Sequence, residues 1–271
     1  MTDTTPLDAA HAAMQAAPDD DAARLRFYER LADGELFVLL GEEAQGDKIS
    51  PAMFNVADGQ FVLAFDREER LAQFTGQPAP YAALSGRVLA QMLAGQSDSQ
   101  PNNPAIGIGL NLEVAPSSIL IPADAVLWLH QTLGPAPDQI EARITEFTAP
   151  AGLPEALIAA LDTKLATAAG LAAGAYLVGV VYEGGSRGHL LGFVGALERA
   201  QSALAKAAGE ALTFTGIEAG MMDVGFFAAD DPVVARLAAA GLRFDLPQTA
   251  APQTYAPAPP GSDPDAPPIL R

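Results

Sequence analysis

The chain contains no cysteine, one tryptophan and three histidines among its 271 residues. Without cysteine it forms no disulfide, holds no thiolate zinc site and has no thiol nucleophile, which excludes several classes of enzyme. The histidines, His11, His130 and His189, are scattered, and none has the paired spacing of a zinc motif. We therefore expect no metal and no cofactor.

Basic residues are also few, with 15 Lys and Arg against 33 Asp and Glu and a formal net charge of −18. Such a surface repels nucleic-acid phosphates and anionic membranes unless basic residues cluster, and here they come singly or in pairs. No run reaches the roughly 18 apolar residues that span a bilayer, and no signal peptide is apparent. We expect an acidic cytoplasmic protein with no nucleic-acid or membrane partner.

The length suggests two domains, at roughly 150 residues per domain. Helical spacing predicts a hairpin of two helices over residues 1–33, followed by an α+β domain over 34–133. A linker at 134–139, marked by two prolines and a glycine, precedes a second α+β domain at 140–247. Seven prolines and few bulky apolar residues predict a disordered tail over 248–271.

In the first domain, short apolar runs predict strands, which are at 35–40, 53–56, 61–65, 81–84, 105–112 and 117–121. Asp58-Gly59 is suited to the tight turn of a hairpin. Asp66 is expected to cap the next helix, and Gly95 to end the one after that. We take residues 61–93 as the centre of this domain.

In the second domain, the predicted order is strand 140–147, helix 153–169, strands 174–183 and 189–194, helix 197–211, strand 220–227 and helix 231–240. The first six elements follow the order βαββαβ. This order favours a ferredoxin-like sandwich in which both long helices cover one face of a four-stranded sheet.

The segments GELFVLL, GQFVLAFDREERLAQF, LSGRVLAQMLAG and IGIGLNLEVAPSSILIPADAVLWL, within residues 34–129, resemble the amino-terminal domain of the SseB family, the enhanced-serine-sensitivity proteins. The segments LPEALIAALDTKL, AYLVGVVYEGGSRGHLLGFV and MMDVGFFAADDP are similar to the carboxy-terminal domain of that family. The resemblance leaves out the first helical hairpin and the tail. It implies a bacterial α+β protein without established catalytic residues. The chain departs from the family pattern at Asp66 and at Asn111-Leu112.

One motif suggests a hydrolase. Residues 184–188 read Gly-Gly-Ser-Arg-Gly, which satisfies the G-x-S-x-G pattern that exposes a nucleophilic serine between a strand and a helix. A strand, however, is predicted after it, so a hairpin tip is the favoured interpretation of Ser186. Similarly, Asp66, Glu68 and Glu69 could form an acid–base set, but interleaved arginines favour a solvated helix start.

The remaining candidates are binding residues. Asn111 interrupts an apolar strand, where it either stabilises a turn or binds a ligand. Arg187 and His189, at the hairpin tip and on the strand after it, complete the set of candidate binding residues, and no catalytic residue is assigned. Gly107 and Gly109 suggest a phosphate loop, but no matching glycine pattern or helix follows them, so they are expected to let another backbone pass close to the strand. A further apolar set, expected to be core and alternatively a partner groove, comprises Met221, Met222, Phe226 and Phe227.

Three functions remain open. The first is a non-catalytic binding or regulatory protein that acts through contacts with an unknown protein partner or as a homo-oligomer. The second is a sensor of small molecules related to amino acids, with a pocket between the domains near residues 134–139. The third is a serine hydrolase that uses Ser186.

Overall fold

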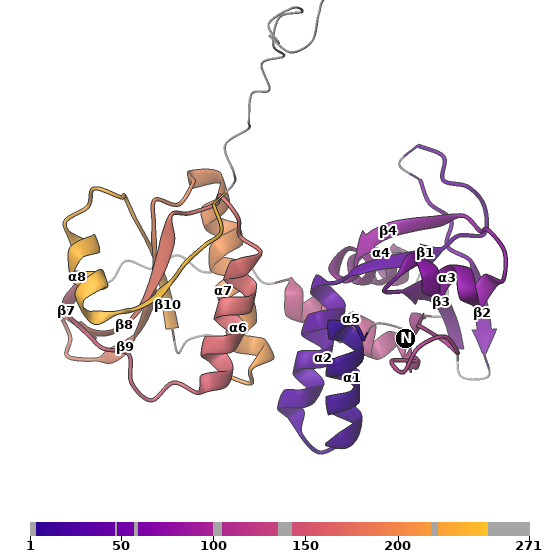
Figure 1. Ribbon diagram of the computed structural model, residues 1–271, viewed down its shortest axis with the longest axis horizontal. Coiled ribbons are helices and arrows are strands. Elements are labelled where there is room, and N and C mark those ends of the chain that lie inside the picture. Colours follow the sequence, from indigo (N-terminus) through magenta and orange to yellow (C-terminus); the bar gives the residue numbers. More distant parts are fainter. Residues whose placement is uncertain are drawn as a thin grey trace, which may run out of the picture.

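The structure is a computed structural model that describes residues 4–46, 48–56, 59–99, 105–134, 143–217 and 222–248. The described chain forms two lobes, each built on a mixed sheet flanked by helices (Figure 1). The α+β class expected from the sequence is therefore confirmed. The expected linker from residue 135 onward and the tail from residue 249 onward lie outside the described residues.

The chain begins with the expected helical hairpin, α1 (Pro6–Ala16) and α2 (Asp21–Asp33). Thr5 and Asp8 form a capping box at the start of α1, and the Asp20 side chain accepts a hydrogen bond from the Ala22 amide at the start of α2. Gly34 ends α2 with an extended backbone (φ −72°), although a glycine at this position commonly adopts the left-handed conformation. The hairpin shares its buried core with the first sheet.

The first lobe contains six strands, which are β1 (Glu35–Leu39), β2 (Met53–Val56), β3 (Gly59–Phe65), β4 (Tyr81–Ser85), β5 (Ile106–Leu110) and β6 (Ile119–Ile121). Their order is β4-β1-β3-β5-β6, and β2 pairs with the first half of β3. The expected hairpin of β2 and β3 is confirmed by their antiparallel register, although Asp58 in its turn is outside the described residues.

Helices cover both faces of this sheet. Helices α1, α2, α4 (Gly86–Ser99) and α5 (Ala123–Leu133) pack on one face, and α3 (Glu68–Thr75) packs on the other through Leu71 and Phe74. Two expected helix boundaries are wrong. Arg67, not Asp66, is the N-cap of α3, and α4 continues past Gly95 to Ser99.

Close approach explains the glycines of β5. A Cβ atom on Gly107 would lie 2.5 Å from the Ile121 carbonyl oxygen and 2.6 Å from the Phe61 ring, and one on Gly109 would lie 2.7 Å from the Leu63 side chain. The expectation that another backbone passes close is confirmed at Gly107, whereas the close neighbours of Gly109 are the side chains of Leu63 and Leu112. A phosphate loop is not needed to account for either glycine.

The second lobe carries β7 (Ile144–Thr148), α6 (Glu155–Ala166), β8 (Gly174–Tyr182), β9 (Arg187–Val194), a short 3-10 helix (Glu198–Ala200), α7 (Gln201–Phe214), β10 (Met222–Phe227), α8 (Val233–Ala240) and β11 (Leu242–Phe244). Helices α6 and α7 both cover one face, as expected, and α8 packs on the other. The short strand β11 was not expected from the sequence.

The ferredoxin-like topology is not confirmed. That topology would place β7 in the middle of the sheet, between β9 and β10. In the structure β9 pairs directly with β10 in parallel, and β7 pairs with β8. The strand order is β10-β9-β8-β11, with β7 beside β8 as well. The second lobe is therefore a mixed sheet of a different order.

The apolar set at β10 belongs largely to the core. Met222 is buried, Phe226 stacks on Phe193 with ring centroids 5.6 Å apart, and Phe227 packs on the opposite face with α8. Met221 lies outside the described residues. At the other end of the lobe, Gln248, taken as the first tail residue, donates a hydrogen bond to the Leu246 carbonyl at 2.9 Å.

Candidate interaction surface at a sheet edge

Asn111 is buried inside the first lobe, where its groups bond within the chain. Its side-chain oxygen accepts from the Asp66 amide at 3.1 Å, and its side-chain nitrogen donates to the Ser117 hydroxyl at 2.8 Å. Its backbone adopts the left-handed conformation (φ 48°) that asparagine tolerates better than most residues. These contacts support the turn-stabilising interpretation over a binding role.

The charged cluster at 66–70 was expected to be a solvated helix start, and for Asp66 and Arg70 this is wrong, because both side chains are buried. The Arg70 side chain is 4% exposed and forms ion pairs with Asp8 at 2.5 Å and Asp66 at 2.7 Å. The Ser117 hydroxyl donates to Asp8 at 2.5 Å, and that of Thr5 to Asp66 at 2.6 Å. The cluster ties α1 to the sheet and to α3, while Glu68 and Glu69 remain exposed.

The electrostatics of this cluster fit a structural role. Burial raises the pKa of Asp8, but hydrogen bonds from Arg70 and Ser117 outweigh it and hold that pKa well below its ordinary value. Beside it, burial lowers the pKa of His11, whose buried Nε2 atom has no hydrogen-bond partner among the described residues. Acid–base catalysis needs groups that reach substrate, whereas these carboxylates bond within the chain.

Arg187 and His189 lie far along the chain from Asn111, on the second lobe. Residues 183–186 connect the paired strands β8 and β9, so Ser186 sits in a hairpin connection and not in a turn between a strand and a helix. The hydrolase motif therefore lacks its structural context. Arg187 is exposed, and the His189 ring nitrogen Nε2 lies 3.0 Å from the Ala151 carbonyl oxygen.

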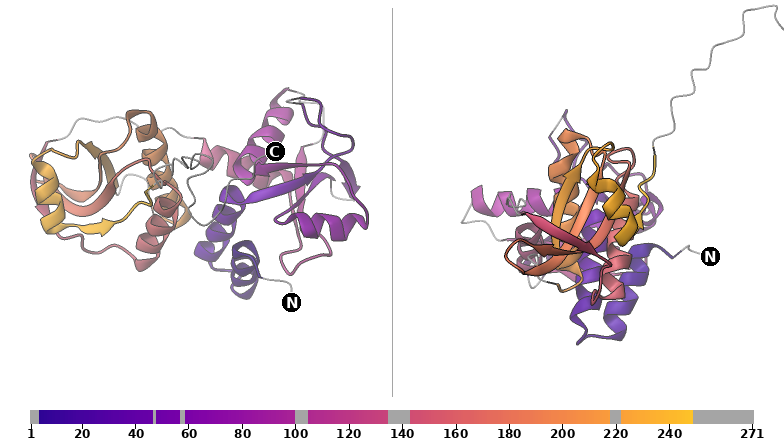
Figure 2. Two further views of the ribbon diagram at one scale, coloured as in Figure 1. Left: turned by 45° about the horizontal axis from the view of Figure 1, so that its top comes forward. Right: turned by 90° about the vertical axis from the view of Figure 1, so that its left-hand side faces the viewer.

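A second charged cluster joins the two lobes, where α2 and α4 meet α6 and α7. Lys164 of α6 bonds Asp33 at 2.6 Å and Glu210 at 3.0 Å, and lies 3.7 Å from Glu29. Arg87 of α4 bonds Glu210 at 2.9 Å and Asp33 at 2.5 Å. In Figures 1 and 2, α6 and α7 lie on the side of the second lobe that faces α2.

The pKa values in this interlobe cluster are shifted in opposite directions. Burial raises the pKa of Glu29 above its ordinary value, because Lys164 compensates it only in part. Burial also raises the pKa of Glu210, but the Arg87 hydrogen bonds and the Lys164 charge outweigh it and lower that pKa overall. The charged side chains of the interlobe cluster therefore occupy part of the boundary between the lobes, where they already form ion pairs with one another.

One end of the first sheet is formed by β4, and the other end by β6. The Leu40 amide donates to the Pro80 carbonyl oxygen at 2.9 Å, and the Gly86 amide donates to the Gly34 carbonyl oxygen at 3.0 Å. The residues just before and just after β4 therefore direct their main-chain groups toward β1. Because strand residues alternate, the N–H and C=O groups of Ala82 and Leu84 also face β1. Those of Tyr81, Ala83 and Ser85 are directed away from the sheet.

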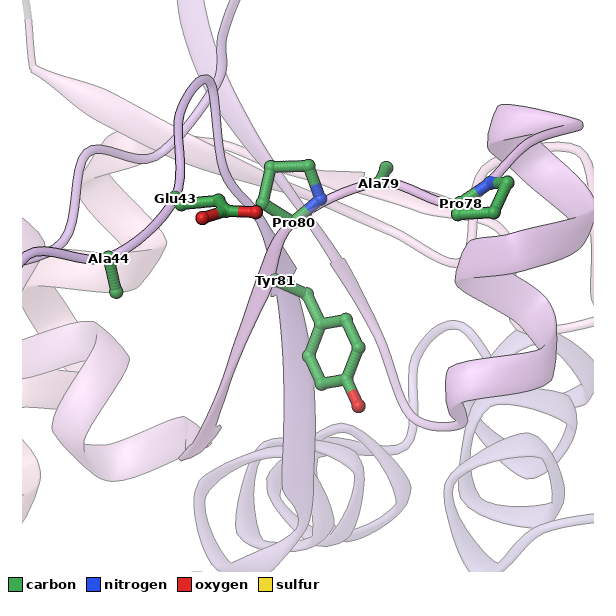
Figure 3. A pocket seen from close by; sticks show the side chains of 6 residues that line it. All are labelled: Glu43, Ala44, Pro78, Ala79, Pro80 and Tyr81. Atoms are coloured by element: carbon green, nitrogen blue, oxygen red, sulfur yellow. The ribbon is translucent and has the colours of Figure 1, made fainter.

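An open groove of about 390 Å³ lies where β4 begins. It is lined by Glu43, Ala44, Pro78, Ala79, Pro80 and Tyr81. Figure 3 shows the Glu43 carboxylate directed toward Pro80, with Pro78 and Ala79 on the other side. Tyr81 is 38% exposed and its ring packs edge-on against Phe37, with centroids 5.5 Å apart. We call this groove, together with the outward-directed N–H and C=O groups of Tyr81, Ala83 and Ser85, the β4 edge.

Neither cluster nor edge suggests a cofactor or a metal. Among the residues that the structure describes, no group of three or more His, Cys, Asp or Glu side chains is placed to hold a metal ion. Within the same residues, no helix is long and apolar enough to cross a membrane. Among the described residues, the main chain and the groove at the β4 edge offer a candidate binding surface.

Residues 7–128 match the family model described as the SseB protein N-terminal domain. The first lobe is similar to the SseB N-terminal domain. The match begins inside α1, so it includes the helical hairpin that the sequence resemblance left out. The match does not extend to the second lobe, and no curated protein and no solved structure matches the chain. The β4 edge thus lies within the matched residues.

Sequence reasoning missed the interlobe cluster, the β4 edge, and the burial of Asp66 and Arg70 against Asp8. The partners Asp8 and Arg70 are separated by 62 positions, and Arg87 and Glu210 by 123, so no local spacing joins them. A signal for the edge was present, because the short strand at 81–84 follows two prolines, at 78 and 80, and carries an aromatic residue at its start. Strand order decides which strand is outermost, and the sequence does not give that order.

Proposed function

We propose that this chain is a non-catalytic binding or regulatory protein that acts through protein contacts at the β4 edge of its SseB-like first lobe. The observation that carries the proposal is a strand at the end of the sheet whose outward N–H and C=O groups adjoin an open groove. Such edges accept an extended segment of a partner as an added strand. The main chain then provides affinity, and the groove provides side-chain specificity.

The alternatives receive less support. The matched family is described as a domain without a named activity, and the Ser186 motif lacks the strand-to-helix turn that a hydrolase requires. A sensor pocket between the lobes would have to coexist with the interlobe cluster, whose buried charges are already paired. A protein-binding role, by contrast, requires only a terminal strand such as β4, whose outward groups can pair with a partner strand.

Replacing Ala83 with proline tests this role. Proline removes the outward N–H group at the middle of β4 and places its ring at the edge, yet edge strands tolerate it because that N–H does not pair within the sheet. We expect Ala83→Pro to remain folded and to lose the partners that the wild-type chain captures in crosslinked pull-downs measured by quantitative mass spectrometry. Affinity for each purified partner should fall at least tenfold, since several main-chain hydrogen bonds are lost together.

The matched control is Ala83→Val, which keeps the N–H group and suits a strand. It should retain every partner that Ala83→Pro loses. Partners that survive the proline substitution would place binding elsewhere. Failure of the wild-type chain to enrich any protein above background, together with a monodisperse monomer in light scattering, would contradict a role in protein contacts.

A further inference from the structure

Three carboxylates lie near the groove and the start of β4. Glu43 lines the groove, and the carboxylates of Glu68 and Glu35 interact electrostatically with the Tyr81 hydroxyl. The hydrogen bond to Glu68 and the charges of Glu68 and Glu35 raise the pKa of the Tyr81 hydroxyl. The whole chain adds a formal net charge of −18. A segment that approaches this edge therefore meets a negative potential.

The two faces of the edge differ in character. Tyr81 and Ala83 lie on the α3 side of the sheet, with Phe37 and Glu35 of β1 as neighbours on that side. Leu84 lies on the opposite side, where it packs against the main core. An added strand would place alternate side chains on these two faces. One set would meet carboxylates and the Tyr81 ring, and the other would meet apolar surface.

We infer that the β4 edge binds an extended basic segment of a partner protein, with Lys or Arg side chains alternating with apolar ones. This inference rests on the proposed function and specifies the chemistry of the partner. The basic side chains contact Glu43, Glu68 and Glu35 and can lie over the Tyr81 ring, which attracts cations. The apolar side chains cover the face that carries Leu84. Opposite charge also speeds the encounter, so association weakens with added salt.

The expected contribution of each carboxylate is modest. Glu43 is exposed, and exposed ion pairs contribute little because water and salt screen them. The substitution Glu43→Lys removes one attraction to a basic segment and adds one repulsion. It should therefore weaken binding of that segment by roughly fivefold. The main-chain bonds remain, so binding is weakened and not abolished.

The test uses two fluorescent peptides, one of alternating lysine and valine and one of alternating glutamate and valine, measured by anisotropy against four full-length proteins. These are the wild type, Glu43→Lys, Ala83→Pro and Glu183→Lys. Glu183 is exposed at the hairpin of the second lobe, so its reversal changes net charge equally at a remote position. We expect the lysine peptide alone to bind the wild type. Its affinity should fall about fivefold in Glu43→Lys, stay within twofold in Glu183→Lys and be lost in Ala83→Pro.

Each other outcome overturns a defined part of the account. Equal losses in Glu43→Lys and Glu183→Lys, with binding still lost in Ala83→Pro, would refute a basic partner while leaving the edge as a binding site. Tighter binding of the glutamate peptide, or no binding of the lysine peptide to the wild type, would also refute a basic partner. Unchanged binding of the lysine peptide to Ala83→Pro would show that it is held elsewhere, which contradicts the proposed function.

Discussion

Replacing Arg70 with methionine should lower the free energy of unfolding by about 3–5 kcal/mol. Asp8 and Arg70 are both buried, and Asp8 keeps its charge because Arg70 and Ser117 hydrogen bond to it. Methionine fills a similar volume but leaves the Asp8 carboxylate without its cation, and an uncompensated buried charge is strongly destabilising. Urea denaturation at neutral pH measures the loss.

The control for this prediction is Arg24→Met. Arg24 forms an ion pair of similar length with Asp21 on α2, at 2.6 Å, but both side chains are at least half exposed. Its loss should cost less than about 1 kcal/mol. If Arg70→Met is no more destabilising than Arg24→Met, the buried cluster does not stabilise the fold as described.

The same cluster predicts how stability depends on pH. The pKa of Asp8 is lower in the folded chain than its ordinary value of 3.8. The folded state therefore binds fewer protons, and the contribution of Asp8 is present above about pH 4 and lost as the pH falls toward the folded pKa. In Arg70→Met this acid-dependent part of the unfolding curve should shrink, because the group that lowers the pKa is gone.

Replacing Lys164 with methionine should destabilise the junction between the lobes by about 3 kcal/mol. Lys164 is the cation nearest Glu29 and shares Glu210 and Asp33 with Arg87. Burial already raises the pKa of the Glu29 carboxyl, and Lys164 is the cation that most offsets this effect. Removing Lys164 therefore leaves Glu29 buried without its main compensating charge. We expect a lower thermal midpoint and, in small-angle X-ray scattering, a larger radius of gyration as the lobes separate.

Lys206→Met is the matched control for the junction. Lys206 lies on α7, four residues before Glu210, and is partly exposed, so its removal changes the net charge equally. It should leave both the thermal midpoint and the radius of gyration close to those of the wild type. A Lys164→Met chain with the scattering curve of the wild type and no loss of stability would contradict a junction held by the interlobe cluster.

The sequence predicted what depends on neighbouring residues. Alternation and apolar runs located β1, β3 and β8, and the Asp58-Gly59 pair indicated the hairpin of β2 and β3. The sequence did not predict features that depend on contacts between residues far apart in the chain. Asp66 and Arg70 have the i, i+4 spacing of a surface pair, and only the packing of α1 against this cluster, through Asp8, shows that the pair is buried.

Strand order is the other property that the sequence did not determine. An order of βαββαβ fits more than one pairing scheme, because the hairpin of β8 and β9 leaves β7 free to join either side. The structure places β7 beside β8. In the first lobe the same uncertainty concealed the candidate site, since Tyr81 becomes an edge residue only because β4 is the last strand of its sheet.

Amide hydrogen exchange of the full-length chain, followed by NMR, tests the β4 edge most directly. In the free protein the outward amides of Tyr81, Ala83 and Ser85 should exchange faster than those of Ala82 and Leu84, which face β1. Addition of the lysine–valine peptide should protect the outward set and leave the inward set unchanged. Equal protection of both sets in the free chain, or no added protection when the peptide is bound, would contradict strand addition at this edge.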